Sequence, residues 1–266
     1  MLAREKEKIG IFSFTSCEGC ELSILERPEE FLKLLENAEI VNSRLLKEKN
    51  PEQQLGIAIV EGSIMSRKEA AELVKLRERT KILLSLGTCA GSGCVQALRN
   101  FFPEPLKKKI VKQAQVEAFE NIKALDEVVK VDYYVRGCPI DADDFYRIIT
   151  LLLHGQSPRR YDIAVCKECK EYGNKCLLIQ GNPCLGPVAY GGCKAVCVTR
   201  GSYCAACRGV IRNSNVDSLR KVLRESCGLG DREIDLLFQG YNNVRGLKEI
   251  KKIIQVKEDT RTDVHA

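Results

Sequence analysis

The chain has 266 residues, enough for two domains, and 44% of them are hydrophobic, so a sizeable core can form. The formal net charge is only +6, with acidic and basic residues interspersed, which argues against a nucleic-acid-binding tail. Residues 1–8 hold neither an apolar signal segment nor a twin-arginine pair, and no stretch approaches the roughly 18 apolar residues of a membrane helix. We therefore expect a cytoplasmic protein without a membrane span. Its fourteen cysteines, set against two histidines, then point to metal binding or catalysis.

Predicted strands alternate with predicted helices in the first half of the sequence. Short apolar runs predict strands at 8–14, 55–60, 81–86 and 131–135. Helical patterns lie between them, at 21–37 with a break at Pro28, from the capping box of Ser66 and Glu69 to about residue 79, and at 141–154. Residues 101–130 are expected to be partly helical. Continuous apolar strands separated by helices predict an α/β fold with a parallel sheet covered on both faces.

The pattern changes after Ser157 and Pro158. Glycine, proline and cysteine dominate as far as Gly209, and little of this segment is periodic. Such a loop-rich segment buries too little apolar surface to fold alone, so metal–thiolate bonds are expected to hold it together. Short amphipathic helices are predicted again at 216–256. We therefore expect two domains, residues 1–157 and residues 158–266.

Four cysteines follow predicted strands of the first domain. Cys17 and Cys20 form a C-x-x-C after the first strand, and Cys89 and Cys138 follow the third and fourth. Because ligands bind beyond the carboxyl ends of parallel strands, these thiols can meet in space. Four thiolates on such an edge suit a four-iron, four-sulfur cluster. A thioredoxin-like redox pair is the alternative, but it leaves Cys89 and Cys138 without a role.

Eight further cysteines crowd between residues 166 and 207 and fall into two groups of four. They are Cys166, Cys169, Cys176 and Cys184, followed by Cys193, Cys197, Cys204 and Cys207. The C-x-x-C pairs at both ends are typical of metal sites. The serious alternative is a pair of structural zinc sites, which also use such pairs. The absence of histidine from this region and the third cysteine set in the sheet domain favour iron–sulfur clusters.

Two cysteines remain outside these sets. Cys94 lies at the start of a predicted helix, and Cys227 lies at the end of another. Structural burial or a free thiol is the preferred interpretation for each. The loop at Thr15 and Ser16 lies where a flavodoxin would bind phosphate, but the neighbouring cysteines crowd that loop.

Four motifs together resemble the small subunit of [NiFe]-hydrogenases, and its cytosolic branch in particular. They are Ser16-Cys17-Glu18-Gly19-Cys20, Gly87-Thr88-Cys89-Ala90, Gly137-Cys138-Pro139 and Pro183-Cys184-Leu185-Gly186-Pro187. The resemblance covers roughly residues 8–210. It implies a flavodoxin-like sheet domain followed by a loop-rich iron–sulfur domain with short helices. Two departures, Cys94 after Gly93 and Ile140 after Pro139, lie near the first cysteine set without removing a ligand.

The resemblance also implies three [4Fe–4S] clusters and the ligands of each. A proximal set would comprise Cys17, Cys20, Cys89 and Cys138. A medial set would comprise Cys193, Cys197, Cys204 and Cys207. A distal set would comprise Cys166, Cys169, Cys176 and Cys184.

The implied function is electron transfer within a cytosolic [NiFe]-hydrogenase. The large subunit would hold the nickel–iron site, and a further flavin, iron–sulfur or ferredoxin-like protein would exchange electrons at the surface. The two histidines, His154 and His265, offer no acid–base constellation, so this chain is expected to supply no catalytic residue itself. A hydrogenase-like reductase without hydrogenase activity is one alternative function, and a zinc-stabilised binding module is another.

Overall fold

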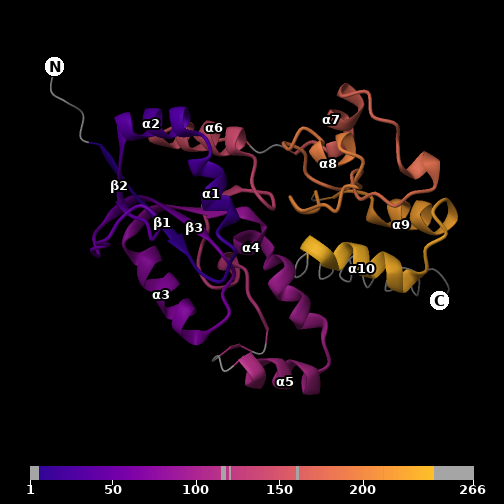
Figure 1. Ribbon diagram of the computed structural model, residues 1–266, viewed down its shortest axis with the longest axis horizontal. Coiled ribbons are helices and arrows are strands. Elements are labelled where there is room, and N and C mark those ends of the chain that lie inside the picture. Colours follow the sequence, from indigo (N-terminus) through magenta and orange to yellow (C-terminus); the bar gives the residue numbers. More distant parts are fainter. Residues whose placement is uncertain (1–5, 115–117, 120, 160–161, 212, 243–266) are drawn as a thin grey trace, which may run out of the picture. The chain divides into compact units, whose positions relative to one another are not determined.

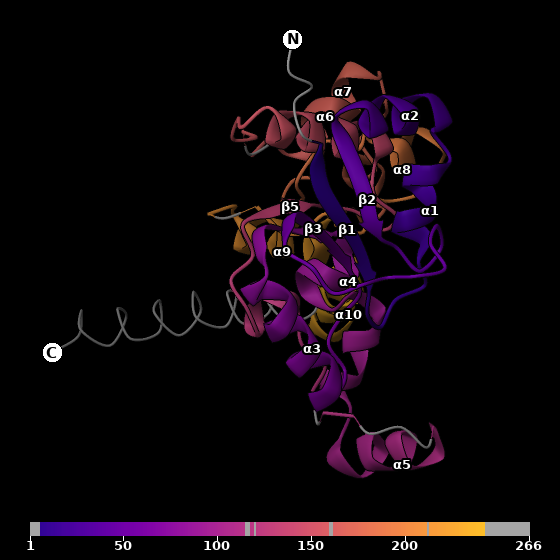
Figure 2. The same cartoon turned by 90° about the vertical axis from the view of Figure 1, so that its left-hand side faces the viewer.

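A five-stranded parallel sheet forms the centre of the amino-terminal part of the chain (Figures 1 and 2). The structure is a computed structural model that describes residues 6–114, 118–119, 121–159, 162–211 and 213–242. The strands are β1 (Glu7–Ser13), β2 (Ala38–Asn42), β3 (Leu55–Glu61), β4 (Thr80–Leu86) and β5 (Tyr133–Val135). Their order is β2-β1-β3-β4-β5, and all neighbouring strands are parallel. The predicted α/β fold is confirmed, and the strand order is the flavodoxin-like one.

Helices cover both faces of this sheet because alternate residues of each strand point to opposite sides. Ile57 and Ile59 of β3 belong to one apolar core, with residues of α1 (Gly19–Leu25), α2 (Pro28–Asn37) and α6 (Ala142–Leu153). Ala58 and Val60 belong to a second core, with α3 (Arg67–Glu78) and α4 (Gly87–Ser92). Figure 1 shows α2 and α6 on one side of the sheet and α3 on the other. All seven residues of β3 are buried, as the continuous apolar run predicts.

Local signals explain most of the element boundaries. Pro28 is the first residue of α2, and the reciprocal capping box of Ser66 and Glu69 starts α3. Strand β2 was not predicted, because it begins directly after α2 without a glycine or proline between them. The partly helical segment contains η1 (Cys94–Phe101), α5 (Glu104–Ala114) and η2 (Leu125–Glu127).

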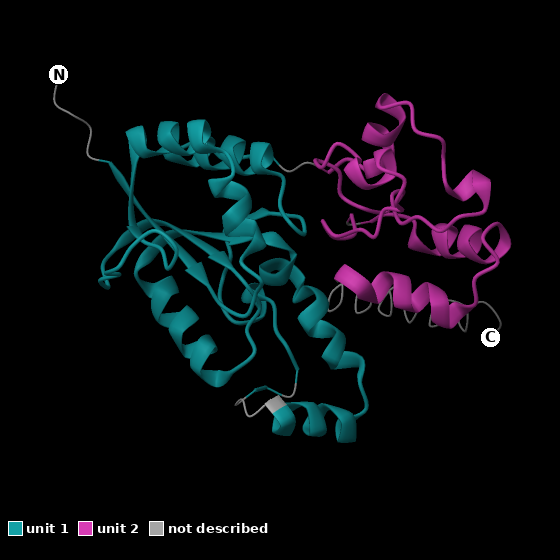
Figure 3. Cartoon of the chain, viewed as in Figure 1, with its two compact units in different colours: residues 1–160 teal, residues 161–266 magenta. Residues whose placement is uncertain are grey.

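The chain divides into two compact units, residues 1–160 and 161–266 (Figure 3). The proposed domain boundary at 157/158 lies close to this division. The second unit, called here the cysteine-rich unit, contains α7 (Val165–Glu171), η3 (Leu178–Gln180), α8 (Val196–Thr199), α9 (Val216–Glu225) and α10 (Asp231–Asn242). The predicted helical segment at 243–256 lies outside the described residues.

One apolar core organises the cysteine-rich unit. Leu219 and Leu223 of α9 pack there with Ile234 and Phe238 of α10, and the cysteine loops supply the rest. Over the described part of the chain, no helix is both long and apolar enough to span a bilayer.

Candidate iron–sulfur sites

The proximal set begins at the switch point of the sheet. Strand β1 has β2 on one side and β3 on the other, and ligands of parallel α/β sheets bind beyond the carboxyl ends of such strands. The loop after β1 carries Cys17, which is exposed, and Cys20, half-buried, is the second residue of α1. Glu18 between them has a φ of 60°, a left-handed conformation that turns the chain sharply into the helix.

Two neighbouring strand ends bring further thiols to Cys20. Cys89 lies in α4, which begins directly after β4, and Cys138 follows β5. The backbone N–H of Thr88 donates to the carbonyl of Gly137 at 2.9 Å, which ties the two loops together. Burial first, then negative charge on Glu61 and on the thiols of Cys89 and Cys138, raises the pKa of Cys20 to about 12. The structure therefore brings three of the four predicted thiols within electrostatic range of one another.

Bare backbone lies directly against the Cys20 thiol. A Cβ added at Gly87 would lie 2.5 Å from Cys20 Sγ, and the φ of Gly87 is +81°. The fourth thiol lies over another glycine, because a Cβ at Gly19 would be 3.4 Å from Cys17 Sγ. At Gly87 there is no room for a side chain, whereas a Cβ at Gly19 would make only an ordinary contact. Both glycines let backbone amides approach sulfur, which suits an iron–sulfur cluster.

Cys94 contacts the proximal set although it was assigned to no cluster. Its side chain is fully buried, and its Sγ lies 4.0 Å from Cys138 Sγ. A hydrogen bond from Cys94 lowers the pKa of Cys138 to about 7 and also lowers the pKa of Cys89. The pKa of Cys94 itself is raised because it is the donor to both. The predicted burial of Cys94 agrees with the structure, but its contact with two predicted ligands was missed.

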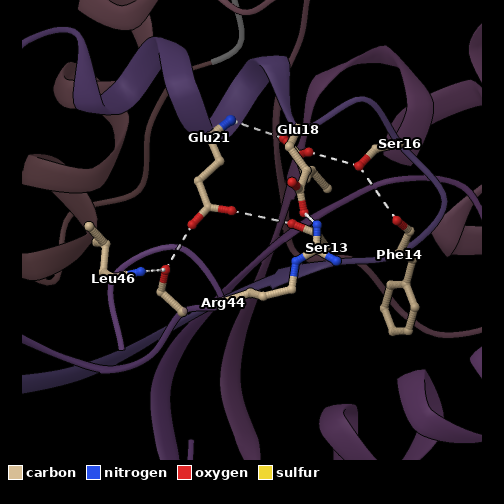
Figure 4. Close-up of polar contacts among 9 residues, drawn as sticks. Ser13, Phe14, Ser16, Glu18, Glu21, Arg44 and Leu46 are labelled. Atoms are coloured by element: carbon tan, nitrogen blue, oxygen red, sulfur yellow. Dashed lines mark hydrogen bonds and ion pairs between the residues drawn. The ribbon is translucent and has the colours of Figure 1, made fainter. Parts of the chain in front are cut away.

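Two buried carboxylates, Glu21 and Glu61, line the same switch point, and Figure 4 shows Glu21 with the labelled hydroxyl residues Ser13 and Ser16. The backbone N–H of Glu21 donates to Glu61 Oε2 at 3.0 Å, and the Ser16 hydroxyl donates to Glu61 Oε1 at 2.8 Å. The hydroxyls of Ser13 and Ser43 donate to Glu21 at 3.3 Å and 2.8 Å. Burial raises the pKa of Glu61 despite the hydrogen bonds it accepts.

These carboxylates were missed by sequence reasoning, and a signal for them did exist. Glu61 is an acidic residue that ends an otherwise apolar strand. A buried carboxylate at that place is expected only where hydroxyls and amides can satisfy it.

The distal set is gathered in the cysteine-rich unit by α7 and the loops that follow it. Cys166 and Cys169 lie in α7, Cys176 is exposed, and Cys184 is buried. Burial, and after it negative charge on Cys184, Cys169 and Cys176, raises the pKa of Cys166 to about 11. The four thiols therefore lie near one another.

The medial set lies around α8, with Cys193 before the helix, Cys197 within it, and Cys204 and Cys207 after it. Burial raises the pKa of Cys204, and negative charge on Cys184, Cys207 and Cys193 adds to that increase. Cys197 in turn contributes to the raised pKa of Cys193, after burial and closer groups. The four thiols are thus linked in one neighbourhood that adjoins the distal set through Cys184.

A short backbone segment joins the medial and distal sets. The N–H of Leu185 donates to the carbonyl of Cys204 at 2.8 Å. A Cβ at Gly186 would lie 3.4 Å from the Sγ atoms of both Cys166 and Cys184. Outside the sets, Cys227 is half-buried, and negative charge on Cys184 contributes, after burial, to raising its pKa.

A single zinc ion and a cubane cluster need different spacings between their four thiolate ligands. Among the described residues, no group of three or more histidine, cysteine, aspartate or glutamate side chains is gathered closely enough to hold a single metal ion. A zinc ion needs four ligand atoms at about 2.0–2.3 Å. The four thiolates of a cubane bind separate iron atoms and therefore lie farther apart. All fourteen cysteines are free thiols.

Comparison with known proteins places this arrangement in one family. The sequence model described as "NADH ubiquinone oxidoreductase, 20 Kd subunit" matches residues 17–152. The delta subunit of sulfhydrogenase 2 from Pyrococcus furiosus is 33% identical over 228 residues, which cover 85% of this chain and 95% of that relative. The delta subunit of an NAD-reducing hydrogenase from Cupriavidus necator is 30% identical over 187 residues, covering 59% of this chain and 86% of the relative.

Solved structures agree with the sequence relatives. A chain of an NAD⁺-reducing [NiFe]-hydrogenase in the H₂-reduced state superposes with a TM-score of 0.54 at 25% identity, covering 59% of this chain and 96% of that one. A chain of the Ni-Fe-Se hydrogenase from Desulfomicrobium baculatum gives a TM-score of 0.54 at 15% identity, covering 81% and 98%, and shows the shared fold. The resemblance seen in the cysteine motifs is thereby confirmed. The chain belongs to the family of the NADH ubiquinone oxidoreductase 20 Kd subunit and, within it, to the small subunits of [NiFe]-hydrogenases.

Proposed function

We propose that this chain relays electrons through three [4Fe–4S] clusters between the nickel–iron site of a separate large subunit and a redox partner at the surface. The partner is a flavin protein, an iron–sulfur protein or a ferredoxin-like protein. The observation that carries the proposal is the approach of Cys20, Cys89 and Cys138, which come from three strand ends far apart in sequence. A pair of redox thiols would need no third partner, whereas a cluster needs four ligands.

Each cluster is assigned its own four ligands. The proximal cluster would be held by Cys17, Cys20, Cys89 and Cys138. The medial cluster would be held by Cys193, Cys197, Cys204 and Cys207. The distal cluster would be held by Cys166, Cys169, Cys176 and Cys184.

The chemistry of these residues fits the clusters. Burial and neighbouring thiols raise the pKa of Cys20 to about 12 and of Cys166 to about 11, so several thiolates are unfavourable there unless a cation compensates them. Iron supplies that positive charge and binds thiolate rather than thiol. The glycines at 87 and 186 leave space against the sulfurs that a side chain would fill.

When bound, a [4Fe–4S] cluster takes up and releases single electrons. The protein supplies ligands, backbone amides and partial exclusion of water, and these set the potentials. Oxidation of H₂ releases two protons and two electrons, so each turnover at the large subunit would send two electrons through this chain one at a time. Acid–base work at hydrogen would belong to the large subunit. Because the cysteines are grouped like metal ligands and none of them forms a disulfide in the structure, we propose a cytoplasmic location.

Metal analysis of the complex, purified without oxygen, tests the proposal. We expect about twelve iron and about twelve acid-labile sulfide per chain, from three cubane clusters. The chain should co-purify with a subunit that carries paired C-x-x-C nickel ligands. Stoichiometric zinc in a colourless protein would favour the zinc-stabilised binding module instead.

A reductase without hydrogenase activity is the second candidate function. It is favoured by the family model, which is named for a quinone-linked subunit and matches only residues 17–152 of this chain. The eight proposed ligands of the cysteine-rich unit lie outside that match. H₂-dependent reduction of an artificial electron acceptor by the complex would exclude this candidate.

A further inference from the structure

A buried carboxylate links the distal and medial sets. Glu168 lies in α7 between Cys166 and Cys169, and only 6% of it is exposed. Its Oε1 accepts a hydrogen bond from the backbone N–H of Gly192 at 2.7 Å. Its Oε2 lies 4.0 Å from Cys193 Sγ, whose S–H donates to it. The helix of the distal set therefore reaches the first cysteine of the medial set.

Backbone pairing holds this contact in place. The N–H of Val165 donates to the carbonyl of Ala189 at 3.0 Å, and the N–H of Gly191 donates to the carbonyl of Ile163 at 2.7 Å. Gly192 is the next residue, so this backbone pairing also restricts the position of its amide. The position of Glu168 beside Cys193 thus depends on the backbone as well as on its own hydrogen bonds.

A buried positive charge lies against Gly192, the residue whose N–H donates to Glu168. Arg208 is 5% exposed, and a Cβ added at Gly192 would lie 2.7 Å from its Nη2. Burial raises the pKa of Cys193. The Ala195 amide and the positive charge of Arg208 lower that pKa, whereas the negative charge of Glu168 raises it. The two buried side chains therefore act on Cys193 with opposite signs.

We propose that Glu168 and Arg208 are positioning residues that set the reduction potential of the medial cluster, Glu168 lowering it and Arg208 raising it. The inference depends on the proposed function, because it requires a cluster on the medial set. With iron bound, Cys193 is a thiolate, and the Glu168 carboxylate faces a negatively charged sulfur without an S–H between them. An added electron is then disfavoured by Glu168 and favoured by Arg208, because charges in a buried site are weakly screened.

Glu168→Gln is the first test, in the full chain within its complex. The amide keeps an acceptor for Gly192, removes the charge and can offer an N–H to the Cys193 sulfur. We expect the medial cluster to titrate at a higher potential in an EPR-monitored redox titration, with unchanged iron content. Its signal is identified as the one lost in Cys197→Ser. The matched control is Glu171→Gln, which removes the same charge from an exposed position of the same helix and should leave all three potentials unchanged.

Arg208→Met is the second test and keeps the proposal falsifiable if Glu168→Gln fails to bind iron. It removes the opposite charge, so the medial potential should fall. Three intact clusters with a medial potential unmoved by either variant would overturn the inference and leave the proposed function standing. Shifts of the same sign in both variants would also overturn it. The two variants remove opposite charges, so an electrostatic effect must shift the medial potential in opposite directions. A wild-type chain without clusters on the cysteine-rich unit would instead contradict the proposed function.

Discussion

The two units of the molecule hold their cysteines in different ways. In residues 1–160 the apolar cores on both faces of the sheet are built mainly from aliphatic and aromatic side chains, and Cys17 and Cys138 are exposed at its edge. In the cysteine-rich unit, Cys184 and Cys204 are themselves core residues, each only 8% exposed. The first unit therefore has a fold to which the proposed cluster would be added, whereas the second includes two of its proposed cluster ligands in the core of the fold.

Removal of iron should therefore produce the largest difference in stability between the two units. After anaerobic chelation under reducing conditions, we expect the cysteine-rich unit to lose protection of its backbone amides, because the proposed metal–thiolate bonds would hold its cysteine loops together. The strands of the sheet should keep theirs. Hydrogen exchange with mass spectrometry measures both units in one sample. Equal protection in the cysteine-rich unit with and without iron would contradict this difference.

Replacement of a single proposed ligand in each unit should show the same difference between the units, with smaller effects. Cys17→Ser should abolish H₂-linked electron flow and remove about four of about twelve irons, while both units stay folded. Cys204→Ser should also destabilise the cysteine-rich unit, because its thiol is part of the core. Iron analysis of the two variants measures the loss of a cluster, and limited proteolysis measures the stability of each unit. Unchanged activity and spectra in Cys17→Ser would count against the proximal set.

Gly87→Ala tests how closely the backbone fits the proposed proximal cluster. The new Cβ would lie 2.5 Å from Cys20 Sγ, so we expect loss or distortion of the proximal cluster signal in EPR. Gly155→Ala is the matched control, since Gly155 also has a positive φ, +69°, but no atom lies within 4 Å of the added Cβ. Both variants carry backbone strain of about 1 kcal/mol or more. Identical EPR spectra of the two variants would show that a side chain at residue 87 does not disturb the proximal cluster.

A smaller difference is expected within the proximal set of the iron-free, reduced chain. The hydrogen bond from Cys94 lowers the pKa of Cys138 to about 7, whereas burial raises the pKa of Cys20 to about 12. Since the thiolate is the nucleophile, iodoacetamide should modify Cys138 with a midpoint near neutral pH and Cys20 only in strong alkali. Peptide mapping across a pH series measures both. Cys94→Ala should move the Cys138 midpoint upward.

The smallest effect is expected for the iron content of Cys94→Ser. Cys94 is buried and donates to two predicted ligands, so its replacement should leave all clusters in place. Loss of about four irons would instead make Cys94 a ligand.

Much of the fold could be predicted because its signals are local. Pro28 begins α2, Ser66 and Glu69 cap α3, and the apolar run of β3 is buried throughout. Strand β2 was missed because it follows α2 without a turn signal. The order of the strands depends on contacts between distant segments, and here the resemblance to a known family supplied what periodicity does not.

The candidate sites were predicted in part for the same reason. C-x-x-C spacing is visible in the sequence for three pairs of cysteines, and the resemblance to a known family supplied the other proposed ligands. The contact of Cys94 with Cys138 and that of Glu168 with Cys193 connect residues from different loops. No spacing rule indicates them, because they arise only when the backbone brings separate segments together.

Diffraction from crystals of the intact complex at the iron absorption edge would show where iron binds in this chain. We expect three separate iron peaks within this chain, one of which is surrounded by the sulfurs of Cys17, Cys20, Cys89 and Cys138. A structure in which Cys17 and Cys138 bind no common iron centre, or in which the cysteine-rich unit holds zinc, would rule out the proposed chain of three clusters.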